Sequence, residues 1–257
     1  LEIVKSQGGV NIGRIYFKGE PLDVDLVVNA IKVHDANVGT LVDYWELLNE
    51  AHQNGDELSK LNDFTIQCID KLPNVRIVCG SFSEGNPSNF DDWPRFFDAM
   101  RAAKATGGGI ALHEYDAPRM TQTTPWRCLR YRKAWELWPA DLQDIPIFIT
   151  ETGIDGGVSH VGKPEHGWKK FVSQAEYVDD LRWYDGELRK DNGYGRPDVH
   201  FATIFTCGWY EPWESFDVSE AREVANYIAG ERDHADPVAP PLPIPVPATV
   251  ALQDQHD

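Results

Sequence analysis

The sequence contains no long run of apolar residues, and this absence limits the classes of protein to which it can belong. No stretch approaches the roughly 18 to 20 consecutive apolar residues that a membrane-spanning helix needs, so we expect a soluble chain. No signal peptide is visible either, because Leu1-Glu2-Ile3-Val4-Lys5 resembles the middle of a helix rather than a charged segment followed by an apolar one. The start therefore looks incomplete, and localisation stays undecided.

Cysteine and positive charge are both scarce. Four cysteines lie in separate segments, with neither the paired spacing of a metal site nor the density of a disulfide scaffold, so we expect buried free thiols at Cys68, Cys79, Cys128 and Cys207. Lys and Arg number 24 against 41 Asp and Glu, which gives a net charge of −17. Such a surface repels phosphate backbones and anionic lipids. It therefore argues against nucleic acid or membrane partners and favours a neutral substrate.

Short apolar runs alternate with longer amphipathic segments, a pattern typical of βα units around a parallel sheet. Candidate strands cover residues 11–17, 42–48, 75–80, 109–115, 145–150 and 200–207, and helices are expected over 23–36, 55–71, 91–106, 124–138, 172–190 and 219–230. A chain of this length can form one α/β barrel, although such a barrel has eight strands. We predict a TIM (β/α)8-type barrel that is N-terminally incomplete, unless the sheet closes irregularly.

The composition changes abruptly near residue 236. Proline recurs between residues 237 and 247, and such a stretch favours extended polyproline II structure and excludes helix. We therefore predict a barrel domain over residues 1–235 and a Pro-rich C-terminal tail or linker over residues 236–257.

Two glutamates, Glu50 and Glu151, close strand-like runs that lie about 100 residues apart. Hydrolysis of a glycosidic bond needs one carboxyl group to protonate the leaving oxygen and a second to attack or stabilise the oxocarbenium-like centre. Because the C-terminal ends of barrel strands meet at one face, two glutamates remote in sequence can converge there. The pattern predicts a pair of catalytic carboxyl groups.

Motifs at four strand ends give the chain a resemblance to a known family. Asn49-Glu50 closes one strand, His113-x-Tyr115 closes the second strand after it, Thr150-Glu151-Thr152-Gly153 closes the next, and an aromatic-rich segment follows the last. Together they resemble the retaining glycoside hydrolases of clan A, the cellulase-like barrels. The resemblance covers most of residues 10–218, with the family's strands three to eight matching the six candidates.

The resemblance implies a retaining double-displacement hydrolysis of the O-glycosidic bonds of a poly- or oligosaccharide. It assigns the general acid/base to Glu50 and the nucleophile to Glu151, and we expect Glu50 to lie in an apolar, partly desolvated setting that raises its pKa. It also implies roles for five residues of the substrate site. Asn49 would bind the sugar 2-hydroxyl, Tyr115 would donate a hydrogen bond to the nucleophile, and His113 would border the same subsite. Trp209 would form the floor on which the sugar stacks, and Arg14 would supply a basic group near the nucleophile. It implies no cofactor and no metal ion.

The chain also departs from the family. Ala51 follows Asn49-Glu50 where much of the clan has proline, and the family's first two strands have no counterpart. Two alternatives therefore stay open: a non-catalytic carbohydrate-binding barrel fragment, and a metal-dependent enzyme that uses His52 and His113 with the two glutamates. Self-association could complete the barrel. The sequence does not identify the sugar, the linkage, endo or exo action, or the oligomeric state.

Overall fold

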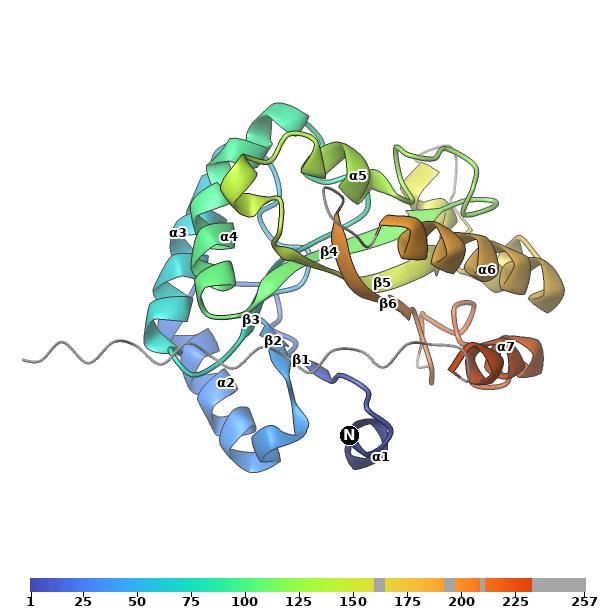
Figure 1. The fold of residues 1–257 in the computed structure, drawn as a ribbon, viewed down its shortest axis with the longest axis horizontal. Coiled ribbons are helices and arrows are strands. Elements are labelled where there is room, and N and C mark those ends of the chain that lie inside the picture. The colour runs from blue at the N-terminus through green and yellow to red at the C-terminus, as the bar shows by residue number, and fades with distance from the viewer. Residues whose placement is uncertain (160–164, 192–196, 209–210, 233–257) are drawn as a thin grey trace, which may run out of the picture.

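The computed structural model is built around a curled sheet of six parallel strands with helices on its outer face (Figure 1). It describes residues 1–159, 165–191, 197–208 and 211–232. The strands are β1 (Ile12–Arg14), β2 (Tyr44–Glu46), β3 (Ile77–Phe82), β4 (Gly109–Asp116), β5 (Pro146–Ile154) and β6 (Asp198–Ile204). They lie side by side in chain order, as consecutive βα units require. All six predicted strands are confirmed.

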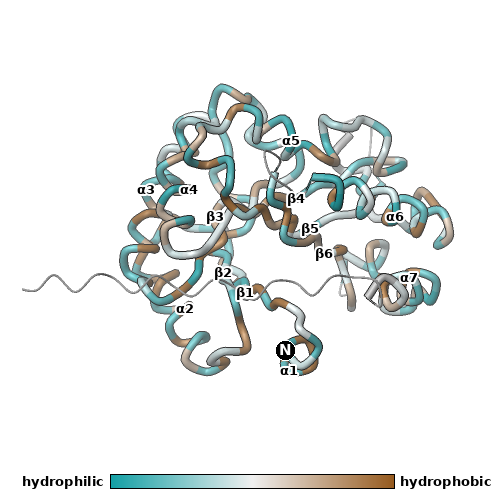
Figure 2. The backbone as a smooth tube through the Cα atoms, viewed as in Figure 1, coloured by the Kyte–Doolittle hydropathy of each residue, from teal (hydrophilic) through white to brown (hydrophobic). Residues whose placement is uncertain are grey.

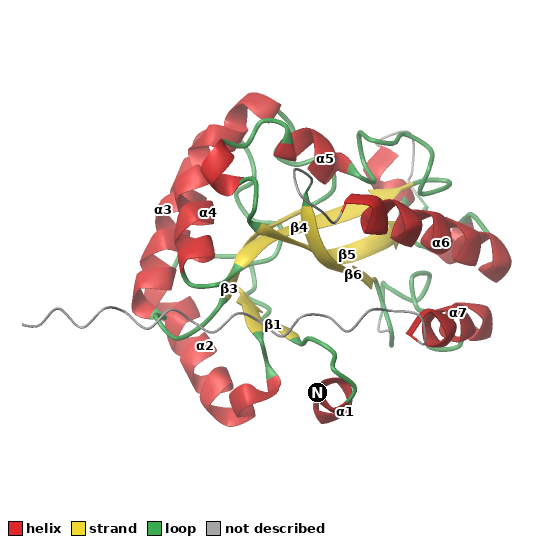
Figure 3. Ribbon diagram, viewed as in Figure 1, coloured by secondary structure: helices red, strands yellow, loops and turns green. Residues whose placement is uncertain are grey.

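Seven α-helices occupy the connections and the two ends of the described chain (Figure 3). They are α1 (Glu2–Ser6), α2 (Val24–Val38), α3 (Gly55–Lys71), α4 (Phe97–Ala105), α5 (Arg130–Trp135), α6 (Gln174–Asp191) and α7 (Arg222–Arg232). Short 3₁₀ segments η1 to η5 cover Gly39–Leu41, Phe90–Phe96, Ala140–Leu142, Gly156–Ser159 and Trp168–Lys170.

Local sequence explains where these helices begin and which face they bury. The side chain of Asp23 caps α2 by accepting a hydrogen bond from the Leu26 amide at 3.0 Å. Helix α3 buries Leu58, Leu61 and Cys68, which recur at helical spacing along one face. The sequence pattern therefore sets both the start of α2 and the inner face of α3.

The predicted helix over residues 124–138 is wrong in its first half. Glu114, on β4, accepts hydrogen bonds from the backbone amides of Leu129 at 2.6 Å and Tyr131 at 3.0 Å. Leu129 also has a left-handed backbone, with φ of 63°. A helix that included this residue would break there, so α5 begins only at Arg130.

Apolar residues pack on both faces of the sheet, and the strands form the hydrophobic centre of the molecule (Figure 2). The larger cluster lies between the sheet and the helices. A smaller cluster consists of Tyr44, Val78, Ala111 and Phe148, which belong to β2, β3, β4 and β5. Gly13 permits β1 to approach β2 closely, because a Cβ there would lie 2.6 Å from the Trp45 ring.

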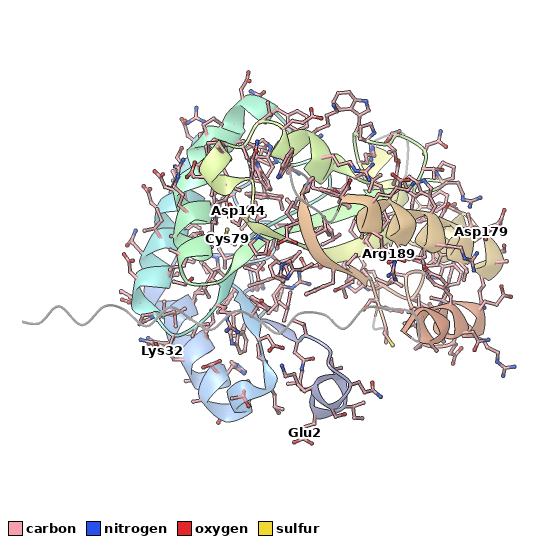
Figure 4. All side chains as sticks on the ribbon, in the orientation of Figure 1. Glu2, Lys32, Cys79, Asp144, Asp179 and Arg189 are labelled. Atoms are coloured by element: carbon pink, nitrogen blue, oxygen red, sulfur yellow. The ribbon has the colours of Figure 1, made fainter. Side chains whose placement is uncertain are left out.

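The cysteine prediction is correct for three of the four residues. Cys68, Cys79 and Cys128 are buried free thiols, whereas Cys207 is exposed. Cys79 lies among the strands, and Glu2 on α1 lies at the rim of the molecule (Figure 4). Across the described residues, none of the helices combines the length and apolar character that crossing a membrane requires. The predicted Pro-rich segment 236–257 lies outside the described residues.

The sheet is a half-barrel, with β1 at one edge and β6 at the other. A cavity of about 260 Å³ lies inside the curl, lined by residues of β1, β2, β5 and β6 together with Val10 and Asn11. Arg14 and Glu46 point polar groups into this cavity. The fold is thus a partial TIM-type barrel, as predicted, and its ring of strands is not closed among the described residues.

Candidate active site

Side chains from β4, from β5 and from the segment that follows β2 converge at one place. Glu50 lies four residues after β2, His113 belongs to β4, and Glu151 belongs to β5. A carboxylate oxygen of Glu50, a carboxylate oxygen of Glu151 and a ring nitrogen of His113 all lie within 4.8 Å of one another. The two glutamates that the sequence analysis selected are therefore brought together.

Glu151 is buried and held by two donors. Its side chain is 11% exposed, and Arg14 Nη2 lies 2.6 Å from its Oε1. Tyr115 Oη donates to its Oε2 at 2.8 Å. Burial alone would raise the pKa of Glu151, but the charges of His113 and Arg14 and the hydrogen bonds from Arg14 and Tyr115 hold that pKa below its usual value. Glu151 is set up as a carboxylate anion.

Strand β5 continues past the predicted end at residue 150, and Glu151 lies within it. The pairing of β5 with β4 shifts between Leu112 and His113, and its pairing with β6 shifts between Ile149 and Thr152. Such irregularities re-aim side chains at the ends of strands. These register shifts lie at His113 and around Glu151, the two residues whose side chains approach each other.

Glu50 occupies a different environment. Its side chain is 38% exposed, so the apolar, desolvated setting that the sequence analysis expected is wrong for this residue. Its φ is 53°, and its amide donates to the Ser81 carbonyl at 3.0 Å. A left-handed backbone at a residue other than glycine costs on the order of 1–3 kcal/mol and is concentrated at functional sites. The strained turn aims Glu50 at the pocket occupied by Glu151.

His113 lies between the two glutamates. Its Nδ1 is 2.8 Å from Glu50 Oε1 and 3.6 Å from Glu151 Oε2, and its side chain is fully buried. Burial lowers the pKa of His113, but the hydrogen bond with Glu50 and the negative charges of Glu151, Glu50 and Glu46 together raise it above its usual value. A proton on Nδ1 is thus held by the hydrogen bond with Glu50, with the charge of Glu151 close by.

Arg14 is held by residues of β2 and of the segment that follows it. Its Nη1 donates to Asn49 Oδ1 at 2.5 Å and lies 3.5 Å from Glu46 Oε2. Ser81 Oγ donates to the other oxygen of Glu46 at 2.8 Å. Neither Glu46 nor Ser81 was predicted to belong to the site. A glutamate inside the apolar run Tyr44-Trp45-Glu46-Leu47-Leu48 was a usable signal, because a buried carboxylate requires a partner.

Aromatic residues border the site beyond β6. Trp209, the predicted stacking floor, lies outside the described residues. Phe205, which the sequence analysis did not select, follows β6 and packs edge-on against Tyr115, with ring centroids 6.5 Å apart. Trp213 packs in the same way against Phe205 at 5.6 Å. Aromatic rings thus support the tyrosine that donates to Glu151.

Glu50, His113 and Glu151 also have the atom types that could hold a divalent metal ion. One contact opposes this use. Arg14 already places a positive charge 2.6 Å from Glu151. His52, the other predicted ligand, pairs with Glu57 at 2.9 Å instead. The geometry suits proton transfer better than metal binding.

Comparison with solved protein structures finds a similar fold. Neither a scan of protein-family models nor a search of curated proteins finds a match. A β-glucosidase from Exiguobacterium marinum has a similar structure, with a TM-score of 0.54, 12% identity, and coverage of 91% of this chain and 77% of that chain.

Two further solved structures are similar at lower scores. A family 39 glycoside hydrolase from Bacteroides cellulosilyticus WH2 gives a TM-score of 0.48 at 17% identity over 77% of this chain. This chain spans 42% of that enzyme's length. An endoglucanase gives 0.41 at 14% identity, covering 84% of this chain and 72% of its own. At these identities we take from the comparisons only the α/β partial-barrel fold, on the strength of the β-glucosidase.

Proposed function

We propose that this protein hydrolyses O-glycosidic bonds of a poly- or oligosaccharide by a retaining double displacement. An oxygen of Glu151 bonds to the anomeric carbon while the glycosidic C–O bond breaks. The leaving oxygen keeps the electron pair of the broken bond and takes a proton from Glu50. Glu50 then removes a proton from water. The water oxygen bonds to the anomeric carbon and releases Glu151 as a carboxylate.

The proposal rests on two glutamates, Glu50 and Glu151, whose environments differ and whose carboxylate oxygens lie within 4.8 Å of each other. Retaining enzymes hold their carboxyl groups about 5–5.5 Å apart, whereas inverting enzymes leave about 6.5–9.5 Å for a water molecule. Glu151 is buried among donors that keep it charged, and Glu50 is open to solvent. A nucleophile needs the first environment, and a group that exchanges protons with water suits the second.

The remaining residues support this chemistry from the sides. Tyr115 and Arg14 orient Glu151, and His113 links the two glutamates. We further propose that Asn49 binds the sugar 2-hydroxyl and that Trp209 forms a stacking floor. The fold likeness to a β-glucosidase agrees with a carbohydrate substrate. Membership of clan A and self-association that completes the barrel stay predictions.

A substrate screen tests the proposal directly. Aryl glycosides of both anomers and a set of β-glucans are incubated with the wild type, Glu151→Ala, Glu50→Gln and the control Glu136→Gln, whose exposed side chain pairs with Lys133 on the surface. We expect the wild type and Glu136→Gln to hydrolyse the same substrates and Glu151→Ala to lose at least about 1000-fold in kcat. Hydrolysis that survives Glu151→Ala would contradict the mechanism.

Two further readouts separate the roles of the glutamates. Azide added to Glu151→Ala should restore cleavage and give a glycosyl azide of inverted configuration, because the small anion fills the space of the lost carboxylate. Glu50→Gln should retain kcat/KM on 2,4-dinitrophenyl glycosides, whose leaving group needs no proton, and lose kcat, because the water of the second step then has no base. Sugar binding by the wild type without any hydrolysis would support the non-catalytic alternative instead.

A further inference from the structure

Glu46 is a third carboxylate inside the barrel, and the mechanism above gives it no task. It is 3% exposed, and its contacts within the site are the 2.8 Å hydrogen bond from Ser81 and the 3.5 Å approach of Arg14. Burial of an ionised carboxylate is costly unless another charge compensates it. The position of Glu46 therefore requires an explanation.

Arg14 and Glu46 lie opposite each other on the paired strands β1 and β2. They are direct partners in the β1–β2 register, so the strand pairing fixes their backbones relative to each other. The guanidinium group of Arg14 reaches Glu151 through Nη2 and Glu46 through Nη1. One cation is thus shared between two buried carboxylates.

A bulge in β3 completes the arrangement. The pairing of β3 with β4 shifts between Gly80 and Phe82, and Ser81 at the shift has φ of 48°. This left-handed residue donates its hydroxyl to Glu46 and accepts the Glu50 amide with its carbonyl. The bulge therefore positions both the acid/base and the third carboxylate.

The double displacement creates a charge imbalance at Arg14. When Glu151 becomes a glycosyl ester it loses its negative charge, and Arg14 would face a neutral group in a partly desolvated site. A cavity of about 260 Å³ beside Arg14 gives its side chain room to move. Glu46 does not react, so its charge persists through the intermediate.

We propose that Glu46 is a positioning residue that serves as the permanent counter-charge of Arg14 and keeps it beside Glu151 while Glu151 is esterified. The proposal rests on the proposed function. Loss of the Glu46 charge then opposes the first step, which discharges Glu151 and would leave Arg14 without a counter-charge. It does not oppose the second step, which restores the carboxylate.

The two steps can be measured separately in Glu46→Gln. Glycosylation is followed by kcat/KM on aryl glycosides with poor leaving groups, and deglycosylation by kcat on 2,4-dinitrophenyl glycosides after a burst of dinitrophenolate. We expect glycosylation to fall about tenfold, equivalent to about 1.4 kcal/mol, and deglycosylation to be unchanged or faster. Glu46→Asp, which keeps the charge, should restore most of the first rate. Equal losses in both steps, or in neither, would overturn the proposal.

A double-mutant cycle tests whether Glu46 acts through Arg14. If it does, Glu46→Gln should cost far less in an Arg14→Gln background than in the wild type. Independent, additive losses would overturn the proposal. The doubly neutral variant removes both members of the Arg14–Glu46 pair, and Glu151 keeps Tyr115 and His113 as partners, so it guards against a failure of Glu46→Gln to fold.

A substrate-free measurement distinguishes failure of this proposal from failure of the proposed function. Ring ¹⁵N shifts of His113 are followed against pH in the wild type and in Glu46→Gln. The charge of Glu46 contributes to the raised pKa of His113, so that pKa should fall in the variant. An unchanged His113 titration would show that Glu46 carries no charge and would overturn the proposal. A protein without glycoside turnover would instead refute the proposed function.

Discussion

Removal of the Tyr115 hydroxyl is the sharpest single test of how the site controls Glu151. Tyr115→Phe deletes the donor that lies 2.8 Å from Glu151 Oε2. The ring itself should stay in place, because it packs edge-on against Phe205 and Phe216. The change therefore isolates one hydrogen bond to the nucleophile.

The size of the effect follows from the contact. A hydrogen bond to a charged group contributes about 1.5–3 kcal/mol, so its loss should move the acid limb of the kcat/KM profile up by about one pH unit or more. The sign is upward because Tyr115 helps to hold the pKa of Glu151 below its usual value. Once that donor is lost, Glu151 takes up a proton at a higher pH and becomes a poorer nucleophile there.

The assay is the pH dependence of kcat/KM on an accepted aryl glycoside. Tyr184→Phe is the matched control, because Tyr184 donates at 2.6 Å to Glu114, a buried carboxyl outside the pair of glutamates. We expect the acid limb to move in Tyr115→Phe and to stay in place in Tyr184→Phe. An acid limb that is the same in Tyr115→Phe and the wild type would refute the assignment of Glu151 as the titrating nucleophile.

Three other predictions concern stability and metal dependence. Gly153→Ala places a Cβ on a backbone with φ of 157° and 2.8 Å from the buried Tyr177 hydroxyl, so it should lower the free energy of unfolding by about 1–3 kcal/mol. In urea melts, Tyr177→Phe should relieve only the part of that loss that comes from the contact with the hydroxyl. Burial raises the pKa values of Glu84 and Glu114 from 4.5 to about 7. The native state then holds protons that the unfolded chain has released, so the free energy of unfolding should fall as pH rises from about 5 to 7. The fall should be less steep in Glu84→Gln than in the wild type. An equal slope in the two proteins would contradict this prediction. A chelator should leave glycoside hydrolysis unchanged, and loss of activity restored by a divalent cation would favour the metal site.

Most of the fold could be predicted from the sequence because strands and helices have separate hydrophobic periods. The six strands and the full span of α3 follow from short apolar runs and from apolar residues at helical spacing. The helix expected from residue 124 failed for a tertiary reason. Glu114, remote from that segment in sequence, takes the amides of Leu129 and Tyr131 that a longer helix would use.

The site was only partly predictable. Strand-end position placed Glu50, His113, Tyr115 and Glu151 together, because parallel strands bring their C-terminal ends together, and the resemblance to clan A glycoside hydrolases singled them out. Strand-end position could not assign a role to Ser81, since neither a left-handed backbone nor a bulge leaves a recognisable mark in a run of residues such as Cys79-Gly80-Ser81-Phe82. The 38% exposure of the Glu50 side chain could not be predicted either, because it depends on the tertiary structure.

The account stands on the chemistry of Glu151, and one measurement addresses it most directly. The 2-deoxy-2-fluoro analogue of a hydrolysed dinitrophenyl glycoside forms a slowly released ester on the nucleophile of a retaining enzyme. Peptide mass spectrometry of the treated protein should place one glycosyl group on Glu151 and none in Glu151→Ala. Turnover of the parent glycoside without any such adduct, or with the adduct on another residue, would contradict the account.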